Sequence, residues 1–380
     1  MRVLVLGGGI FGLTTALALR ARGHDVTVRD PGPIPHPLAE STDISKIVRI
    51  DYGADADYTA LGERALLGWR AWNARWPRPL FHETGVTFLT RRPMQPGGFE
   101  HDSFALLTSR GHPLVRLDAA AIAVRFPAYR PGVYVDGYFS PVGGWAESGA
   151  VVAQLATEAR DHGVAIERSG HPLLGSRPHH GELGSRPGAD LTIVCVGAWA
   201  AQLVPELAGA VRAVGQPVFH VRPPDASRFA AERFPVFGAD ISRTGYYGFP
   251  VTDGIVKIAN HGPGIALDPD APRETTAAQE VALRAMLAES LPDLADAPIV
   301  HRRLCVYGDT VDGNFWIARH PDDPSLVVAT GGSGHAFKFA PVLGELIADI
   351  ALGIPHPLAH KFRWRPGAPA GAEAARHGVD

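Results

Sequence analysis

Cysteine, net charge and long apolar runs are all scarce in this sequence. Its 380 residues include two cysteines, Cys195 and Cys305, too few for a disulfide framework, which favours a reducing compartment. The net charge is −3, from 36 basic and 39 acidic side chains, so no basic nucleic-acid surface is expected. No apolar run reaches the ~18 residues that cross a bilayer. We therefore expect a cytoplasmic protein that binds neither nucleic acid nor membranes.

Lysine is scarce as well. Four of the 36 basic residues are lysines, and arginine supplies the rest. This composition, rich in glycine and proline, favours arginine wherever charge alone is needed. A lysine that has not been replaced by arginine is a candidate for a role that needs a compact, titratable charge. For any single lysine, chance is the alternative explanation. The four positions are Lys46, Lys257, Lys338 and Lys361.

The first thirty residues predict a complete βαβ unit. Residues 2–6 (RVLVL) form a short buried strand, and GGGIFG occupies residues 7–12. Residues 14–23 have helical spacing, and 24–30 (HDVTVRD) form a second strand. A glycine motif between a strand and a helix is typical of a dinucleotide-binding fold.

The spacing within this motif indicates how a dinucleotide would be held. Gly7 permits the tight turn, Gly9 lets a pyrophosphate approach the backbone, and Gly12 lets the helix pack close to the strand. The helix N-terminus offers free N–H groups to the phosphates. Asp30 is placed to accept hydrogen bonds from a ribose. A structural glycine turn without nucleotide is the alternative, and the motif alone does not separate NAD from FAD.

Further elements extend along the chain. The tryptophan-rich stripe of 57–76 reads as a core helix, and Cys195 as a core residue of a buried strand. A repeated GSRP flanks His179 and His180, but paired histidines without further spaced ligands predict no metal site. The remaining predictions are helices at 149–162, 274–291 and 341–352, strands at 81–90, 164–168, 191–199 and 325–330, and a hairpin over 246–261 that turns at Asp253-Gly254.

Five ordered segments resemble the sarcosine oxidase-like flavoprotein amine oxidases, a group within the D-amino-acid oxidase fold family that also contains N-methyl-tryptophan oxidases and fructosyl-amino-acid oxidases (amadoriases). The resemblance covers nearly the whole chain. It implies an α/β fold with a Rossmann-like FAD-binding domain and a mostly antiparallel substrate domain. The segments are GGGIFG, STDISKIVRIDYG (41–53), YYGFPVTDGIVKIANH (246–261), RLCVYGDT (303–310) and ATGGSGHAFKF (329–339).

The resemblance implies two roles close to the flavin. In that family the cysteine of the RLCVY motif forms a thioether to the flavin 8α carbon, so Cys305 is the implied covalent anchor; a buried free cysteine is the alternative. Lys257 matches the lysine that activates O2 beside the flavin, where a cation in a low-dielectric pocket stabilises the charge placed on oxygen. A solvated surface charge is the alternative for Lys257.

The resemblance also implies a substrate site. Lys338 and Arg49 match the pair that binds the substrate carboxylate, and the planar fork of Arg49 suits both oxygens. Lys46 matches a position over the flavin ring that is arginine in sarcosine oxidases and lysine in amadoriases. Tyr247, His261, Tyr307 and His335 match pocket positions, with His335 a donor to flavin or substrate. A core histidine bound to a backbone carbonyl is the alternative, above all for His261.

A larger set is implied to contact the cofactor. Asp30 stands where glutamate is more usual, and Asn314 and Ala318 replace a histidine and an aspartate of the sarcosine oxidases. Aspartate is acceptable at position 30, because either carboxylate can reach the ribose, but Asn314 and Ala318 together with Lys46 argue against sarcosine as the substrate. The implied FAD-binding residues are Gly7, Gly9, Ile10, Phe11, Gly12, Asp30, Ser41, Thr42, Lys46, Cys305, Gly332, Gly334, His335 and Lys338.

The resemblance also predicts the function. We expect a monomeric FAD-dependent oxidase of the C–N bond of a secondary-amine amino acid (N-methyl, cyclic imino or fructosyl), giving an imine and reducing O2 to H2O2. A dehydrogenase or biosynthetic tailoring flavoenzyme with another electron acceptor is the alternative. An NAD-dependent enzyme or non-catalytic scaffold would leave Cys305 unmodified. The expected domains are a discontinuous FAD-binding domain (1–80, 142–215 and 306–380) and a substrate domain (81–141 and 216–305).

Overall fold

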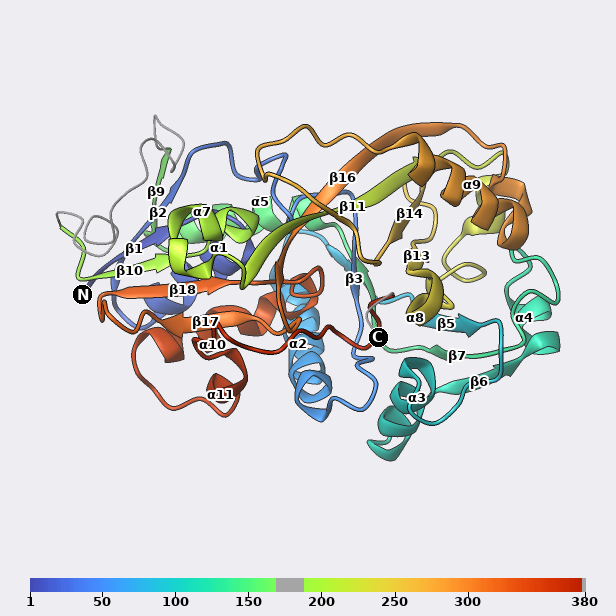
Figure 1. The fold of residues 1–380 in the computed structure, drawn as a ribbon, viewed down its shortest axis with the longest axis horizontal. Coiled ribbons are helices and arrows are strands. Elements are labelled where there is room, and N and C mark those ends of the chain that lie inside the picture. Colours follow the sequence, from blue (N-terminus) through green and yellow to red (C-terminus); the bar gives the residue numbers. More distant parts are fainter. Residues whose placement is uncertain (169–187, 378–380) are drawn as a thin grey trace.

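The computed structural model describes residues 1–168 and 188–377, so the predicted loop over 171–190 lies largely outside the described residues. Two large sheets lie side by side, with the long strands β11 (Val211–Val221) and β16 (Ile299–Thr310) running between them (Figure 1). The predicted α/β fold is confirmed. No helix within the described residues is both long and apolar enough to cross a membrane.

A six-stranded sheet forms the first layer. Four strands, β1, β2, β9 and β10, run parallel to β18, and β17 is antiparallel at one edge. Val3 and Val5 of β1 pack on one face and Leu4 and Leu6 on the other, because successive side chains point to opposite sides of a strand. The order is β17 (Trp316–Arg319), β18 (Leu326–Thr330), β10 (Leu191–Val194), β1 (Arg2–Leu6), β2 (Asp25–Asp30) and β9 (Ala165–Arg168).

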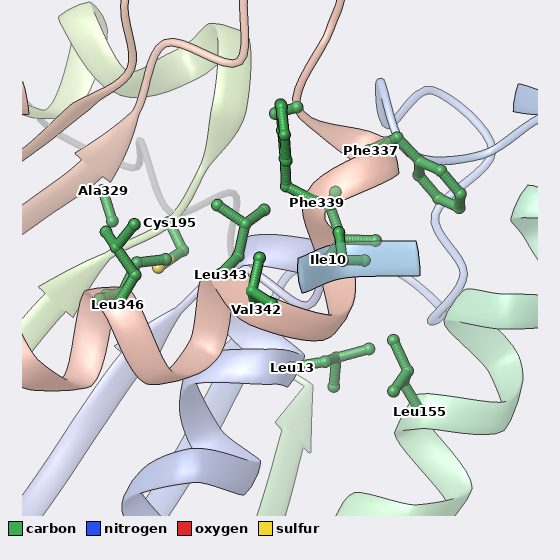
Figure 2. Packing of buried hydrophobic residues seen from close by; sticks show 14 of the residues in the cluster. Ile10, Leu13, Leu155, Cys195, Ala329, Phe337, Phe339, Val342, Leu343 and Leu346 are labelled. Atoms are coloured by element: carbon green, nitrogen blue, oxygen red, sulfur yellow. The ribbon is translucent and has the colours of Figure 1, made fainter. Parts of the chain in front are cut away.

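Three helices cover one face of this sheet: α1 (Ile10–Ala21), α5 (Ser148–Asp161) and α10 (Ala340–Ala351). α1 and α10 approach so closely at Gly344 that a Cβ there would lie 2.1 Å from the Thr14 carbonyl oxygen. Apolar side chains of both helices belong to one cluster, which also contains Cys195 (Figure 2). The prediction that Cys195 is a core residue is confirmed.

The turn between β1 and α1 needs its glycines. Gly7 has φ +101°, and a Cβ on Gly12 would lie 1.9 Å from the Gly7 carbonyl oxygen. Any larger side chain at Gly12 would push the helix away from the strand. The predicted βαβ unit is therefore confirmed, with the close helix–strand approach that the motif implied.

A nine-stranded sheet forms the second layer. Its only parallel pair, among the described residues, is β12 with β5, and β16 pairs with β11 off the main path. The predicted turn at Asp253-Gly254 is confirmed, since both residues have positive φ, 51° and 73°. The strand order is β15 (Ile265–Ala266), β11, β14 (Val256–Asn260), β13 (Tyr246–Gly248), β12 (Val236–Ala239), β5 (Val86–Thr90), β7 (Asp136–Ser140) and β6 (Val115–Asp118).

A small third sheet lies beside the two layers. It contains β3 (Lys46–Val48), β8 (Gly144–Ala146) and β4 (Phe81–His82). The single strand predicted over 81–90 is wrong, because the chain turns at Gly85, with φ +79°, and its two halves join different sheets. The remaining helices are α2 (Ala56–Arg75), α3 (Phe99–Ser109), α4 (Ala119–Arg125), α7 (Ala200–Leu203), α8 (Ile241–Thr244), α9 (Ala277–Ser290) and α11 (Ala359–Phe362).

The predicted domain boundaries cross the two long strands. Gly215 pairs with Val306 and Gln216 with Cys305, so the boundaries at 215/216 and 305/306 fall at neighbouring positions of one β ladder. The division into FAD-binding and substrate domains stays a prediction. Both strands belong to the nine-stranded sheet, so these boundaries would cut through the middle of that sheet's longest ladder.

Candidate active site

A cavity of about 690 Å³ opens at the carboxyl ends of the parallel strands, where ligands of open α/β sheets bind. Its walls come from the first glycine-rich turn, from residues 30–46 and from the second glycine-rich loop at 331–337. The predicted cofactor-binding residues that line it are Gly7, Gly9, Ile10, Phe11, Asp30, Ser41, Lys46, Gly332 and Gly334.

The cavity ends on the N-terminus of α1, and that terminus is prepared for an anion. Its first turn has no acidic side chain, and its N-cap Gly9 has no side-chain hydrogen bond to the helix. The Ser41 hydroxyl accepts a hydrogen bond from the Ile10 N–H at 3.3 Å. Free N–H groups with the helix dipole behind them favour phosphate oxygens.

Asp30 lies at the cavity wall and shapes the glycine turn. Its carboxylate accepts hydrogen bonds from the backbone N–H groups of Gly8 (2.8 Å) and Gly32 (2.9 Å). A Cβ on Gly9 would meet the Ser41 hydroxyl at 3.3 Å, so glycine keeps the wall close to the backbone. A dinucleotide with an adenosine ribose near Asp30 and a pyrophosphate at α1 fits these residues.

Other predicted cofactor residues do not line the cavity itself. Gly12 packs the helix on the strand, and Thr42 accepts a hydrogen bond from Arg303 through its backbone carbonyl oxygen. Cys305 is buried just beyond the cavity, where its Sγ lies 3.6 Å from the Lys46 Nζ. The structure therefore brings Lys46 and Cys305 together at one end of the cavity.

Lys257 is buried in β14 and forms an ion pair that the sequence did not predict. Its Nζ lies 2.7 Å from Asp43 Oδ2 and donates to the Ser45 carbonyl oxygen at 2.5 Å. Burial lowers the pKa of Lys257 to about 8, against the opposing charge of Asp43. Burial acts to raise the pKa of Asp43, but Lys257, His220 and Arg303 outweigh it and hold that pKa well below its usual range.

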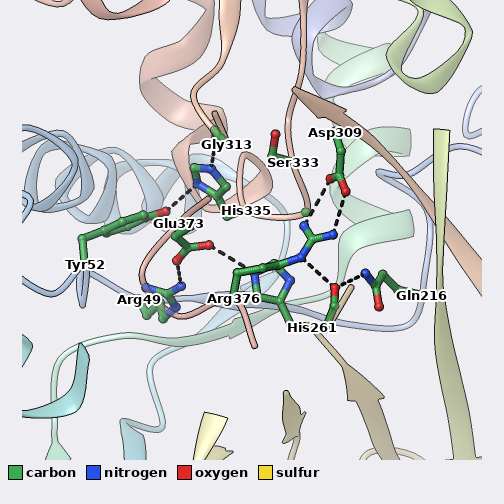
Figure 3. Close-up of polar contacts among 12 residues, drawn as sticks. Arg49, Tyr52, Gln216, His261, Asp309, Gly313, Ser333, His335, Glu373 and Arg376 are labelled. Carbon is green, nitrogen blue, oxygen red and sulfur yellow. Dashed lines mark hydrogen bonds and ion pairs between the residues drawn. The ribbon is translucent and has the colours of Figure 1, made fainter. Parts of the chain in front are cut away.

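Arg49 is buried and bound to a carboxylate from the far end of the chain. Its Nη2 pairs with Glu373 Oε1, and Glu373 Oε2 lies 3.2 Å from His261 Nε2 (Figure 3). The Arg49 guanidinium also lies over the Tyr52 ring, 4.8 Å from its centroid. Burial opposes ionisation of Glu373, but the charge of Arg49 outweighs it and holds the pKa of Glu373 well below its usual range.

Lys338 and His335 meet on the same tyrosine. Lys338 Nζ donates to the Tyr52 hydroxyl at 2.9 Å and to the His335 carbonyl oxygen at 2.7 Å. The His335 ring contacts the Tyr52 hydroxyl at 3.0 Å and the Gly313 carbonyl oxygen at 2.9 Å. Burial lowers the pKa of His335 to about 3 and, with the charge of Arg49, lowers that of Lys338 well below its usual range. Both histidine nitrogens thus have protein partners.

The two predicted pocket tyrosines lie beside the predicted flavin anchor. Cys305 and Tyr307 belong to one small buried cluster, and Tyr247 packs against it. Gly334 approaches so closely that a Cβ there would lie 2.2 Å from the Tyr307 ring. The second glycine-rich loop, the anchor strand β16 and the hairpin strand β13 therefore converge on one point.

Four side chains of this site escaped sequence reasoning. Tyr52 and Asp43 lie inside segment 41–53, which was selected for Lys46 and Arg49. The sequence does not show which side chains Tyr52 and Asp43 contact. Glu40 lines the cavity, accepts hydrogen bonds from Gly308 and Gly334, and has a pKa raised by burial to about 7. Glu373 carries no motif at all, and no local signal indicates it.

The fold and the site together define a dinucleotide-binding protein whose cavity lies at the carboxyl ends of the parallel strands. The model of the FAD dependent oxidoreductase (DAO) family matches residues 2–350. The chain belongs to that family. It is 30% identical, over 381 residues, to the N-methyl-L-tryptophan oxidases of Salmonella dublin and Salmonella typhimurium, covering 92% of this chain and 94% of each relative.

Solved structures agree with this assignment. Fructosyl amine:oxygen oxidoreductase (Amadoriase I) from Aspergillus fumigatus superposes with a TM-score of 0.78 at 26% identity, over 96% of this chain and 89% of that one. A thermally stable mutant of fructosyl peptide oxidase shares the fold with a TM-score of 0.82 at 24% identity, covering 100% and 99%. The resemblance to sarcosine oxidase-like flavoproteins is confirmed, and the protein is an FAD-dependent oxidoreductase.

Proposed function

We propose that the protein is an oxidase that breaks the C–N bond of a secondary amine of amino-acid type and reduces O2 to H2O2. The observation that carries this proposal is the placement of two lysines near Cys305: Lys46, which is partly buried, lines the end of the cavity, and Lys257 is buried outside the cavity lining. Lys46 contacts Cys305, and Lys257 lies on β14, which pairs with the same strand, β11, as the Cys305 strand β16. Two ammonium groups beside the cofactor end are suited to stabilise charge on reduced oxygen.

The proposed reaction takes two electrons from the amine and gives them to O2. The neutral amine loses a hydride from the carbon next to nitrogen and a proton from the nitrogen, and water hydrolyses the resulting imine to a carbonyl compound and an amine. The chemistry that FAD supplies when bound is the transfer of these two electrons to O2, which takes up two protons. The chain holds this cofactor through the α1 N-terminus, Asp30 and Ser41.

The substrate side of the proposal rests on the cluster around Arg49. Arg49, Lys338 and Tyr307 remain the proposed substrate-binding residues, and His261, Tyr247 and His335 the proposed pocket residues. All lie on the segments that converge beyond Cys305, and all are buried except Tyr247, which is partly buried. Burial strengthens every charge interaction made there, so a single misplaced charge is costly.

One observation favours the alternative, a dehydrogenase or tailoring flavoenzyme that passes electrons to another acceptor. The ammonium of Lys257 is already paired with Asp43, which offsets part of its charge. The site would be less reactive towards O2 if that pair persists during turnover. Peroxide yield per substrate consumed therefore separates the two functions.

The experiment that tests the function is a screen of N-methyl, cyclic imino and fructosyl amino acids. The purified holoenzyme is given each amine in air, and peroxide and carbonyl product are measured together. Equal amounts of peroxide and carbonyl product support the oxidase. Carbonyl product that forms only when an artificial electron acceptor is added supports the dehydrogenase, and no product from any amine contradicts both.

We expect the flavin to be covalently attached through Cys305. Cys305→Ala should then release all of its FAD on acid denaturation, whereas the wild-type pellet stays yellow. Cys195→Ala is the matched control: Cys195 is also buried and itself lines the cavity, so loss of the adduct in Cys305→Ala alone would identify Cys305 as the anchor. Mass spectrometry of the intact chain measures whether flavin is attached, and a wild-type chain without a flavin adduct would contradict the assignment.

A further inference from the structure

The C-terminal segment at residues 371–377, which we call the strap, lies across the proposed substrate site. It begins with the Gly371 N–H donating to the Val311 carbonyl oxygen at 2.8 Å. It ends with the His377 N–H donating to the His261 carbonyl oxygen at 3.1 Å. Between these points Glu373 points inward to Arg49 and His261 (Figure 3).

The residues that follow Glu373 are anchored. Arg376 pairs with Asp309 through Nη2 at 2.6 Å, and its Nε donates to the Gly262 carbonyl oxygen at 2.7 Å. Both partners of that ion pair are nearly inaccessible to solvent. Ala375 is fully buried in an apolar cluster beneath the strap. These contacts hold Glu373 as a built-in part of the site.

The consequence for Arg49 concerns charge. One guanidinium nitrogen, Nη2, is bound by Glu373, and the other, Nη1, is buried without a hydrogen-bond partner among the described residues. A neutral carbonyl oxygen could accept a hydrogen bond from Nη1 without adding charge. A ligand carboxylate would bring a second negative charge beside Glu373, and like charges in a buried site repel strongly.

Within the described part of the chain, no other fixed cation is ready to offset that second charge. Lys338 is buried next to Arg49, and its pKa is lowered by burial and by the arginine charge. His261 is buried as well, and burial lowers its pKa. Arg376 is already paired with Asp309. Arg49 is thus the main positive charge next to a bound ligand, and it is already paired with Glu373.

We propose that Glu373 is a specificity-determining residue that competes with a substrate carboxylate for Arg49. The site then favours amino-acid-like amines whose carboxyl group is blocked, as an amide or ester, over the free acids. This inference rests on the proposed function, because it requires Arg49 to face the substrate. It narrows the substrate class within that function.

The test compares two ligands of the same shape, methylthioacetate and methylthioacetamide, by calorimetric titration of the holoenzyme. The wild type should bind the amide at least as tightly as the acid. Glu373→Gln should bind the acid roughly 10–100-fold more tightly than the wild type does, because one buried like charge is removed. Affinity for the amide should stay within about twofold, since no charge is involved.

A surface carboxylate provides the control. Glu289→Gln removes the partner of Arg91, 2.9 Å away, on the exposed side of α9 and should change neither affinity. A wild type that binds the acid tenfold more tightly than the amide overturns the inference even if Glu373→Gln does not fold. An unchanged acid affinity in Glu373→Gln also overturns it. If neither ligand binds any holoenzyme, Arg49 does not face the substrate, and the proposed function fails with the inference.

Discussion

Replacing Lys257 with methionine should slow the reoxidation of the reduced enzyme by O2 by a factor of about 10²–10³, which corresponds to 3–4 kcal/mol of lost charge stabilisation. Reduction by substrate without oxygen should change little, because that half of the reaction places no charge on oxygen. Stopped-flow absorbance measures the two halves separately. The fold should survive, since Asp43 keeps His220 and Arg303, each at 3.4 Å.

The same lysine predicts a dependence on pH. The pKa of Lys257 is about 8, so the ammonium is present below that pH and lost above it. Reoxidation of the wild type should therefore slow as pH rises through about 8. The methionine variant should show no such step, because it has no proton to lose at this position.

Lys361→Met is the matched control for this substitution. Lys361 is partly buried, is bound by Asp55 and Asp57, and does not line the cavity, so its loss should leave reoxidation unchanged. Lys257→Arg should restore the rate incompletely, because a planar guanidinium places its charge differently from an ammonium. Reoxidation of Lys257→Met at the wild-type rate would favour the dehydrogenase function over the oxidase function.

Replacing Arg49 with alanine should lower the free energy of unfolding by about 3–5 kcal/mol, because Glu373 would remain buried without its counter-charge. Glu373 cannot relax outward easily, since Arg376 and Ala375 fix the chain beyond it. Urea unfolding of the holoenzyme measures the loss. This effect should exceed that of removing any surface ion pair.

A double-mutant cycle identifies the cause. Arg49→Ala combined with Glu373→Gln should be less destabilised than Arg49→Ala alone, because the unpaired buried charge is gone. Arg70→Ala, which breaks a surface pair with Glu83, should cost no more than about 1 kcal/mol. Simple additivity of the two buried substitutions would show that the pair is not energetically coupled.

The sequence predicted those parts of the molecule that depend on neighbouring residues. The β1–α1–β2 unit needs its glycines within six residues, and the Asp253-Gly254 turn needs two adjacent residues with positive φ. The strand predicted over 81–90 failed because its alternating pattern continues through Gly85, while the two halves join different sheets. Periodicity reports burial and does not report which sheet provides it.

The side chains around Arg49 also show that sequence patterns do not predict contacts between residues far apart in the chain. Arg49 was identified by its motif, whereas its partner Glu373 is 324 residues away in a segment of alanine and glycine. Asp43 lies three residues before Lys46, but its partner Lys257 is set by the approach of β14. Partner choice at such distances is decided by the packing of the two sheets.

The ladder between β11 and β16 limits how the chain can be divided into building blocks. Its paired residues run from Val211 with Thr310 to Val221 with Ile299 within the nine-stranded sheet, while Val211 also packs in one cluster with Leu4 and Leu6 of the six-stranded sheet. A cut of the chain at 215/216 and 305/306 would divide this ladder in the middle of both strands. A chimaera designed to transfer substrate preference would have to include β11 and β16 together, and it would therefore also transfer Cys305 and Tyr307, which lie on β16.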